Sequence, residues 1–405
     1  MKPISSTERI QILDILRGFA VLGILAVNIG GFAAPSFYPG YVPPPMPWYD
    51  QAAHAFVQLF AEGKFYTIFS FLFGLGFAVQ LQRAEAKGKD IRSFYPRRLL
   101  VLFAIGVLHS ILLWSGDILR MYALWGFALL AFRRRSNRTL LIAAGLLFVL
   151  SFAALGLLGG QSGVNTGSPG GAEMQLADLA RAAYTSSSIG DYFTFQLIAS
   201  LVVFVFIALS QGPSVLALFL IGLLAGRSRI FERLDEHRAL ARRVAAVAFP
   251  VGLLANVLFV FTDGWTSAFG LTVGAPTLAA AYVAGLSLLS LRPAGARALA
   301  PMASVGRMAL TNYVLQSLVC ALLFYGIGFG LYEQVGAAGL LGITVAIYAL
   351  QLPLSAWWLG RYRFGPLEWV WRTLTYGERP PMRVTPRSGD DPEPASPGHL
   401  LGSGQ

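Results

Sequence analysis

The stretch D-I-L-R-G-F-A-V-L-G-I-L-A-V-N, residues 14–28, predicts the first membrane-spanning helix of this protein. Asp14 and Arg17 are three residues apart, so they share a face of the helix and can form an ion pair. Gly18 and Gly23 are small enough to let a neighbouring helix pack closely. Asn28 places an amide near the far end of the apolar run. Because charges and amides are costly inside a membrane, we treat these polar side chains as candidate functional residues.

The composition predicts an integral membrane protein with an all-α fold, a polytopic bundle of transmembrane helices. Of the 405 residues, 55% are hydrophobic and only 13% are charged, whereas a soluble protein has about 25% charged residues. The mean hydropathy is +0.60. The net charge of +11 arises from short basic clusters between apolar runs. That pattern is typical of loops beside a lipid bilayer, and it favours no nucleic-acid partner.

The cysteine and histidine content bears on disulfides and metal sites. Cys320 is the single cysteine, which excludes an intramolecular disulfide. With four histidines besides, the chain has too few ligands for a structural zinc site, and no metal is predicted.

About ten apolar runs approach the roughly 20 residues that a helix needs to span a bilayer. They lie near residues 12–31, 64–82, 97–114, 118–132, 139–158, 197–226, 244–261, 269–291, 304–328 and 337–359. The fourth run is short, and Gln211, Gly212 and Pro213 interrupt the sixth. We count the sixth run as one crossing, because the arginine-rich segment 227–243 then lies on the same side as the other basic loops.

The distribution of positive charge predicts the orientation of the chain. With ten crossings, all but three of the 31 Lys and Arg lie on one side, and the exceptions are Lys64, Arg120 and Arg181. The basic side of a membrane protein is the cytoplasmic side, so both termini are expected there. The alternative for the first run is a cleaved signal peptide. The polar residues of that run argue against it.

Three segments outside the predicted spans have a distinctive amino-acid composition. Residues 159–190 are rich in Gly and Ser and read as a flexible linker, with a weakly amphipathic piece at 172–183. Residues 361–383 mix tryptophan, tyrosine and arginine, which indicates an interfacial helix. Residues 385–405 are rich in Pro, Ser, Gly and Asp and are expected to be disordered.

A small set of polar side chains falls within or near the predicted spans. On the inner side they are Asp14, Arg17 and Arg307; toward the outer side they are Asn28, His54, Glu62, Lys64, His109, Asp117 and Arg120; and Asn312 and Gln316 share a face of the ninth span. For Glu62 and Lys64 we favour an interfacial ion pair that caps the second span. A metal site made of His54, His109 and Asp117 has suitable residue types, but no ligand spacing supports it.

His109 is the strongest candidate for a catalytic residue. It lies in the outer half of the third predicted span, and histidine can take and return a proton near neutral pH. Asp117 follows across a tight turn and is able to orient the ring or to bind an external hydroxyl. The alternative is a packed histidine that bonds a neighbouring backbone group.

Several motifs resemble one family. They are D-x-x-R-G at residues 14–18, E-G-K-F-Y-T-I-F-S-F-L-F-G-L-G at 62–76, L-H-S-I-L-L-W-S-G-D-I-L-R-M-Y-A-L at 108–124, G-R-M-A-L-T-N-Y-V-L-Q-S at 306–317 and F-G-P-L-E-W-V-W-R at 364–372. The chain resembles the YeiB-type family of uncharacterised bacterial inner-membrane proteins over nearly its whole length up to the tail. It is more distantly similar to the transmembrane acyltransferases, among them the lysosomal heparan-alpha-glucosaminide N-acetyltransferase and bacterial O-acyltransferases of surface polysaccharides.

The resemblance implies a multi-pass protein of the bacterial inner (plasma) membrane. It implies an acyltransferase-like half over residues 1–226, a YeiB-type half with the interfacial helix over 227–384, and the tail 385–405. It also implies acyl-CoA as co-substrate, entering from the cytoplasm, and an envelope glycan or lipid acceptor on the far side. Asp14, Arg17, Arg307, Asn312 and Gln316 are then the expected cofactor-binding residues.

One departure from the distant relatives affects the catalytic assignment. The polysaccharide O-acyltransferases carry an arginine in the first helix and, after ten intervening residues, a histidine taken as catalytic. The matching residues here are Arg17 and Asn28, and an amide is not a general base. The base is therefore expected to be His109, with His54 as second choice, while Asp117 and Asn28 assist.

Three functions compete at this point. The first is acyl transfer with acyl-CoA phosphates held by inner arginines and the oxyanion held by Asn28 or Asn312. The second is a secondary transporter or flippase, which typically has matched halves with broken helices near mid-bilayer. The third is a non-catalytic membrane partner, in which the buried polar residues serve packing alone.

Overall fold

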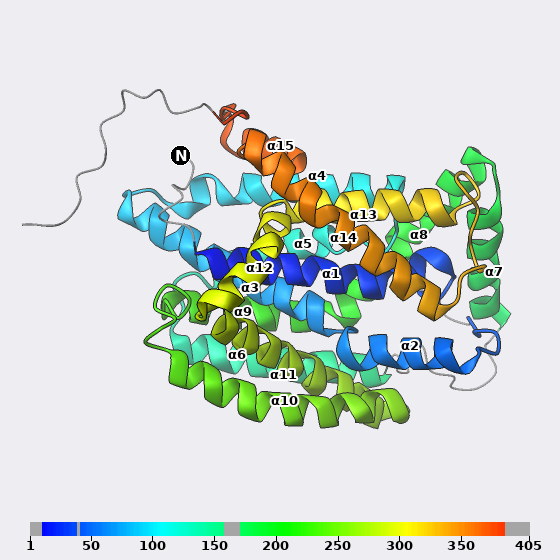
Figure 1. Cartoon of the computed structure of the whole chain (residues 1–405), viewed down its shortest axis with the longest axis horizontal. Helices are drawn as coiled ribbons and strands as arrows, with labels where there is room; N and C mark the ends of the chain where they lie inside the picture. The colour runs from blue at the N-terminus through cyan, green and yellow to red at the C-terminus, as the bar shows by residue number, and fades with distance from the viewer. Residues whose placement is uncertain (1–9, 39–40, 158–170, 385–405) are drawn as a thin grey trace, which may run out of the picture.

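The computed structural model describes residues 10–38, 41–157 and 171–384 as an all-α bundle whose long helices run roughly side by side (Figure 1). Eight of its helical segments are long and apolar enough to cross a membrane. They are α1 (Gln11–Ala33), α2 (Trp48–Phe60) taken with α3 (Lys64–Ala86), α4 (Tyr95–Leu112), α6 (Asn137–Leu157), α8 (Ile189–Ser210), α10 (Arg238–Phe261), α11 (Gly264–Ser290) and α14 (Ala337–Arg361). The predicted polytopic membrane protein is thus confirmed.

Three of the ten expected spans, the fourth, sixth and ninth, are not single straight crossing helices. The fourth is α5 (Leu119–Ala131), whose 13 residues extend only about 20 Å. The ninth is a pair of helices, α12 (Pro293–Arg307) and α13 (Ala309–Phe324), bent by 78° at Met308. Counting that pair as one span gives nine candidate spans rather than ten in the part of the chain that the structure describes.

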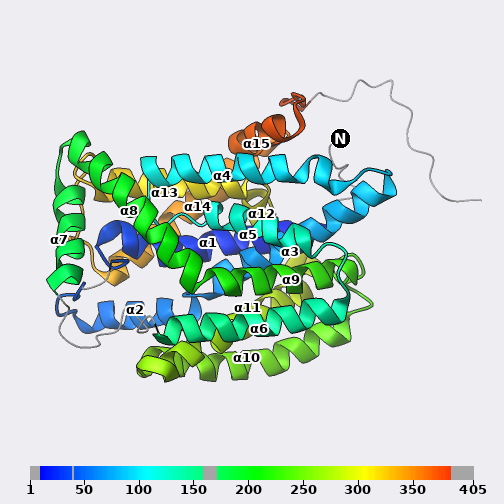
Figure 2. The same cartoon turned by 180° about the vertical axis from the view of Figure 1, so that it is seen from behind.

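The sixth expected span is divided where the sequence indicates a break. α8 ends at Ser210 and α9 (Gly212–Arg227) follows directly, with Pro213 in its first turn, where a proline is well tolerated. Figure 2 shows α8 crossing the bundle obliquely and α9 continuing toward the opposite end. The interruption therefore redirects the chain without reversing it.

Helix α1 runs through the middle of the bundle and is the most buried of the candidate spans (Figure 1). It contacts α3, α11, α12, α13 and α14. At the crossing with α12, Gly18 lies against the Met302 carbonyl and Gly306 lies against the Asp14 carbonyl. A Cβ at either glycine would overlap backbone atoms of the partner helix, so these two glycines set how closely the helices approach.

The segment expected to be a flexible linker is partly helical. Residues 171–185 form α7 (Gly171–Thr185), whose Ala177, Ala180 and Tyr184 are buried in an aromatic core cluster with Tyr325. The expectation was wrong for this part because the apolar face of a short amphipathic segment found a tertiary partner. Residues 158–170 and the tail 385–405 lie outside the described residues.

The expected interfacial segment contains helix α15 (Pro366–Tyr376), which follows α14 and packs on α4 and α13. The Glu368 carboxylate accepts from the backbone N–H groups of Leu310 and Thr311 at 2.8 and 3.1 Å, so it caps the first turn of α13. Burial raises the pKa of Glu368, while the donors from Thr311 and Leu310 oppose that rise. α15 is thereby fixed to the bent helix pair.

The start of α1 and helix α15 lie toward the same end of the bundle (Figure 1). The same end holds the last turn of α9 and the first turn of α10, which flank the arginine-rich segment 227–243 (Figure 2). The structure therefore gathers at one end several segments that the charge pattern assigns to one side of the membrane. That this side is the cytoplasm stays a prediction.

Candidate functional site

The candidate site is built by a loop that turns back into the bundle. α4 ends at Leu112, residues 113–118 reverse direction, and α5 begins at Leu119, with Arg120 beside Gly106 of α4. Gly106 precedes the end of α4 by six residues, so α5 starts about 9 Å inside the bundle. A Cβ on Gly106 would meet the Arg120 backbone nitrogen and the Asp117 carboxylate. Non-helical backbone at membrane depth requires protein around it, and here that protein is present.

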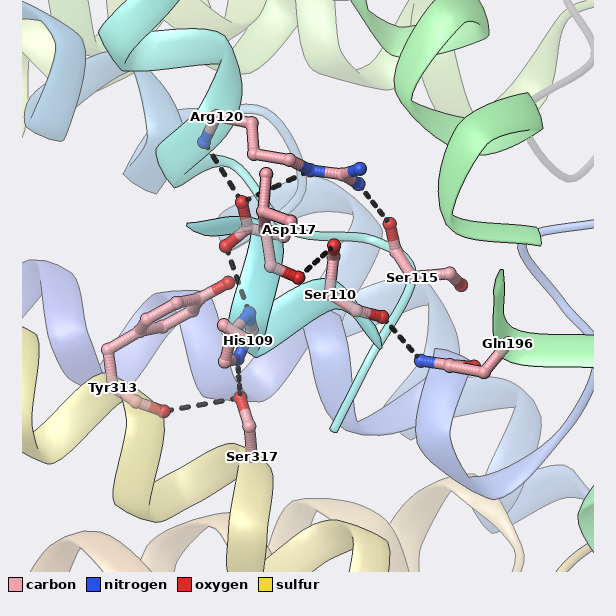
Figure 3. A network of polar contacts seen from close by, with 9 residues as sticks. His109, Ser110, Ser115, Asp117, Arg120, Gln196, Tyr313 and Ser317 are labelled. Carbon is pink, nitrogen blue, oxygen red and sulfur yellow. Dashed lines mark hydrogen bonds and ion pairs between the residues drawn. The ribbon is translucent and has the colours of Figure 1, made fainter. Parts of the chain in front are cut away.

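Asp117 and His109 meet in this fold-back (Figure 3). His109 Nδ1 lies 2.9 Å from Asp117 Oδ1, and the two side chains are 1% and 0% exposed. The contact does not follow the line of the ring N–H, so it is a close electrostatic contact rather than an aligned hydrogen bond. Such contacts in unliganded sites often tighten once substrate is bound. The orienting role of Asp117 stays a prediction, with the two groups in close contact.

Arg120 supplies the positive charge beside the Asp117 carboxylate. Its backbone N–H donates to Asp117 Oδ2 at 2.9 Å, and its Nε lies 3.7 Å from the same oxygen. Its guanidinium also donates to the Ser115 carbonyl at 3.3 Å and stacks on the Phe204 ring at 4.8 Å. Arg120 is buried at the start of α5, where the Asp117 carboxylate offsets its charge.

The other ring nitrogen of His109 faces helix α13 (Figure 3). His109 Nε2 lies 2.9 Å from the Ser317 hydroxyl, and the Tyr313 ring lies against the imidazole with ring centroids 4.9 Å apart. Ser317 is 2% exposed. A carboxylate, an imidazole and a hydroxyl therefore lie in line, in the order found in nucleophilic catalytic triads.

A chain of hydroxyl and amide groups holds the fold-back against neighbouring helices. The Tyr38 hydroxyl lies 3.0 Å from both the Ser115 hydroxyl and the Tyr184 hydroxyl. Tyr184 donates to Gln196, whose amide donates to the Ser110 carbonyl at 2.8 Å. The loop that carries Asp117 is thus tied to α7 and α8 as well as to α4.

The remaining expected catalytic residues lie apart from this cluster. His54 is exposed on α2, and Asn28 is half-buried on α1. Among the described residues, neither makes a polar contact with His109. His54, His109 and Asp117 also form no metal-binding group within the described ranges. Of the two candidate histidines, His109 is the one that lies in a buried polar cluster.

The expected inner residues fall into two groups. Arg17 Nη1 donates to Asp14 Oδ1 at 3.0 Å, which confirms the predicted pair, and Arg307 ends the neighbouring helix α12. Asn312 and Gln316 instead use their amides between helices. Gln316 donates to Gln351 of α14 at 2.8 Å, and Asn312 donates to Ser355 at 3.0 Å.

Lys64 differs most from its expected surroundings. Its side chain is fully buried, and its Nζ donates to the Gln58 carbonyl at 2.8 Å and lies 5.9 Å from the Phe259 ring centroid. Within the described residues Glu62 and Lys64 make no contact at ion-pair distance, but their two charges interact electrostatically. Lys64 is buried by protein, and its main hydrogen-bond partner is the Gln58 carbonyl.

A second polar region lies along α4 from the site. Arg98 and His109 are eleven residues apart, which is three helical turns and about 16 Å, so they share a face of α4. The Arg98 guanidinium stacks on Trp371 of α15 at 3.6 Å, and Trp371 donates to the Arg98 carbonyl at 2.9 Å. Arg17 and Arg372 are close enough to repel Arg98 electrostatically. Three arginines from separate segments therefore gather at this end.

Tyr313 and Ser317 belong to the motif at residues 306–317, but the sequence assigned them no role. The signal was present in the spacing, because residues 312, 313, 316 and 317 recur on one helix face. What the sequence lacked was the partner, since Ser317 and His109 are separated by 208 positions.

Comparison of the sequence with known proteins shows which family the chain belongs to. The chain matches the family described as "Protein of unknown function (DUF418)" over residues 225–378. It is 37% identical to "Uncharacterized protein YxaH" of Bacillus subtilis (strain 168), over 93% of this chain and 96% of that protein. It is 30% identical to "Uncharacterized protein YeiB" of Escherichia coli (strain K12), over 91% of this chain and 96% of that protein. Since these likenesses cover nearly the full length, the chain belongs to the YeiB/YxaH family of bacterial multi-pass membrane proteins.

Proposed function

We propose that this protein is a membrane-embedded acyltransferase that moves an acyl group from cytoplasmic acyl-CoA to a hydroxyl or amine acceptor at the periplasmic face. The observation that carries the proposal is the His109 ring, held between the Asp117 carboxylate and a hydroxyl at 2.9 Å. That arrangement is the one a general base needs. The acceptor class, an envelope glycan or lipid, follows from the outer position predicted for the site.

His109 acts as the base and then as the acid. Its Nε2 removes a proton from an attacking hydroxyl, and the imidazolium returns a proton to the departing CoA thiolate. Asp117 stabilises the imidazolium, because its carboxylate lies 2.9 Å from Nδ1 in a site with almost no exposed surface. Arg120 places positive charge beside that carboxylate, with its backbone N–H at 2.9 Å and its Nε at 3.7 Å from Asp117 Oδ2.

The arginines at the other end of α4 suit the CoA phosphates. Arg98 has its guanidinium positioned by Trp371, and Arg17 and Arg372 add charge beside it. Arginine binds phosphate in a bidentate manner. With the phosphates near Arg98, the pantetheine arm follows the α4 face toward His109, about 16 Å away. The separation supports a substrate that is long and anionic at one end.

The test compares two histidines in the full-length protein. Membranes that contain wild type, His109→Ala, His109→Gln or His54→Ala receive acetyl-CoA and, separately, palmitoyl-CoA labelled in the acyl group. We expect both His109 variants to lose about a hundred- to ten-thousand-fold in transfer to membrane acceptors, while His54→Ala keeps the wild-type rate. The Gln variant keeps a polar side chain beside Asp117, and detergent thermal stability checks its folding.

Full transfer by a folded His109→Gln variant would contradict the base assignment. If the His54 variant alone lost activity, the base would be His54. If wild type transferred neither label, the acyltransferase proposal would be overturned.

A second candidate is a secondary transporter, favoured by the 78° bend between α12 and α13. Broken helices beside a buried His, Asp and Arg are typical of proton-coupled transport sites. The same variants distinguish the two functions. A transporter reconstituted in vesicles would dissipate a substrate or proton gradient without moving any label, and His109→Gln would abolish that flux.

A further inference from the structure

We infer that Ser317 is the nucleophile of this site and carries the acyl group as a covalent ester between the two half-reactions. The inference rests on the proposed acyltransferase function, because it assigns a second catalytic residue to the same reaction. Its basis is the contact between the Ser317 hydroxyl and His109 Nε2 at 2.9 Å.

The hydrogen bond of the Ser317 hydroxyl to its own helix is longer than those of several other hydroxyls in the bundle. Serine and threonine in membrane helices usually donate to the carbonyl four residues earlier. Thr67, Ser70 and Ser210 do so at 2.7, 2.7 and 2.8 Å. For Ser317 the corresponding distance, to the Tyr313 carbonyl, is 3.3 Å, which is longer than its distance to His109. The serine proton is therefore better placed for the imidazole than for its own helix.

The three side chains come from separate elements that the fold fixes firmly. His109 is on α4, Asp117 is on the loop 113–118, and Ser317 is on α13. Glu368 of α15 caps the first turn of α13, and Trp371 of the same helix holds Arg98 of α4. α15 therefore links the helix of the nucleophile to the helix that carries both the base and the phosphate-binding arginine.

The first step balances as a simple acyl exchange. The Ser317 oxygen attacks the thioester carbonyl, its proton moves to His109 Nε2, and the carbon–sulfur bond breaks. The thiolate takes the proton from His109 and leaves as CoA. In the second step the acceptor hydroxyl or amine gives its proton to His109 and attacks the seryl ester. The ester carbon–oxygen bond breaks, and the proton returns to the Ser317 oxygen.

A covalent intermediate suits a site of this shape. The His109 side chain is 1% exposed and Ser317 is 2% exposed, so the site does not hold two large substrates side by side. With the acyl group kept on Ser317, CoA leaves toward the arginine end before the acceptor arrives from the other end.

The experiment looks for the intermediate directly. Purified full-length protein in detergent is incubated with labelled acetyl-CoA or palmitoyl-CoA without acceptor, denatured, and assayed for bound label by peptide mass spectrometry. The variants are Ser317→Ala, Ser317→Cys and the control Ser200→Ala. Ser200 is also a buried serine, and it donates only within its own helix, to the Leu197 carbonyl at 2.9 Å.

We expect label on the peptide that contains Ser317 in wild type and in the Ser200 variant, and none in Ser317→Ala. Transfer to membrane acceptors should fall on the order of a thousandfold or more in Ser317→Ala. Ser317→Cys should retain label as a thioester that neutral hydroxylamine releases, which a merely structural serine would not produce.

Wild-type transfer by Ser317→Ala, or label found on a different residue, would overturn this inference and leave the acyltransferase proposal standing. Transfer by wild type with no trapped label, together with an active Ser317→Ala variant, would mean direct attack by the acceptor. No transfer and no label with either probe in wild type would overturn the proposed function itself.

Discussion

The Asp117 carboxylate serves two partners at once. One oxygen faces His109, and the other accepts from the Arg120 backbone and faces its guanidinium. The side chain has no exposed surface, so water does not screen these charges. Removing the carboxylate charge would leave Arg120 as a buried cation without its main counter-charge, and would leave the His109 ring without a fixed orientation.

Asp117→Asn is therefore expected to affect both stability and activity. Loss of one partner from a buried ion pair costs about 3 kcal/mol or more, which should lower the detergent melting temperature clearly. Acyl transfer should fall as well, because the imidazolium loses its stabilising charge. Asp263→Asn is the matched control, since Asp263 is exposed before α11. A melting temperature equal to wild type would mean that Arg120 does not depend on Asp117.

At the scale of elements, the approach of α1 to α12 determines where the inner end of the first helix lies. Gly18 contacts the Met302 backbone, and Gly306 contacts the Asp14 backbone. Moving the two helices apart would therefore break both contacts. Tyr348 of α14 donates to the Gly18 carbonyl at 2.9 Å and adds a third helix to the crossing. The Asp14–Arg17 pair is held directly beside this crossing.

Gly18→Ala tests this packing. The added methyl would overlap the Met302 carbonyl, which is backbone and does not rotate away, so we expect a loss of about 1–3 kcal/mol. Gly76→Ala is the control, because nothing lies within 4 Å of a Cβ at that helical position. It should be neutral or slightly stabilising. Thermal unfolding in detergent compares the two variants, and equal melting temperatures would contradict the close packing.

At the scale of the whole molecule, the two ends of the described chain lie at the same end of the bundle (Figure 1). The count of eight or nine candidate spans leaves out α5, which brings the chain back from the end of α4 to the start of α6. The chain therefore crosses the length of the bundle here without a helix long enough to span it alone. The loop 113–118 covers the distance between the end of α4 and the start of α5, and it also carries Asp117.

The topology is tested with reporters fused to the full chain. We expect a fusion after Arg387 to report the cytoplasm and an insertion at Gly170 to report the periplasm, because the basic segments then lie inside. A reporter that becomes active only in the periplasm when fused after Arg387 would contradict the prediction. The two positions control for each other, since a single reporter type must be active at one and silent at the other.

The sequence alone determined the membrane class, the family and most of the long helices. These follow from local properties: apolar runs of sufficient length, a break at Gln211–Pro213, and short contiguous sequence motifs. The Asp14–Arg17 pair was equally predictable, because both residues lie on one helical turn. His109 and Asp117 were predictable as partners because only a short turn separates them in the chain.

Only the tertiary structure decided where the loop 113–118 lies and what faces the other side of His109. A polar loop after an apolar helix reads as exposed, yet here Asp117 and Arg120 are buried because they offset each other's charge. Lys64 is also buried, but its ammonium donates to the Gln58 carbonyl. Ser317 reaches His109 across 208 positions, and no local pattern encodes that contact. It exists because the fold brings Ser317 and Tyr313 of α13 against His109 of α4, and such an approach is a property of the whole bundle.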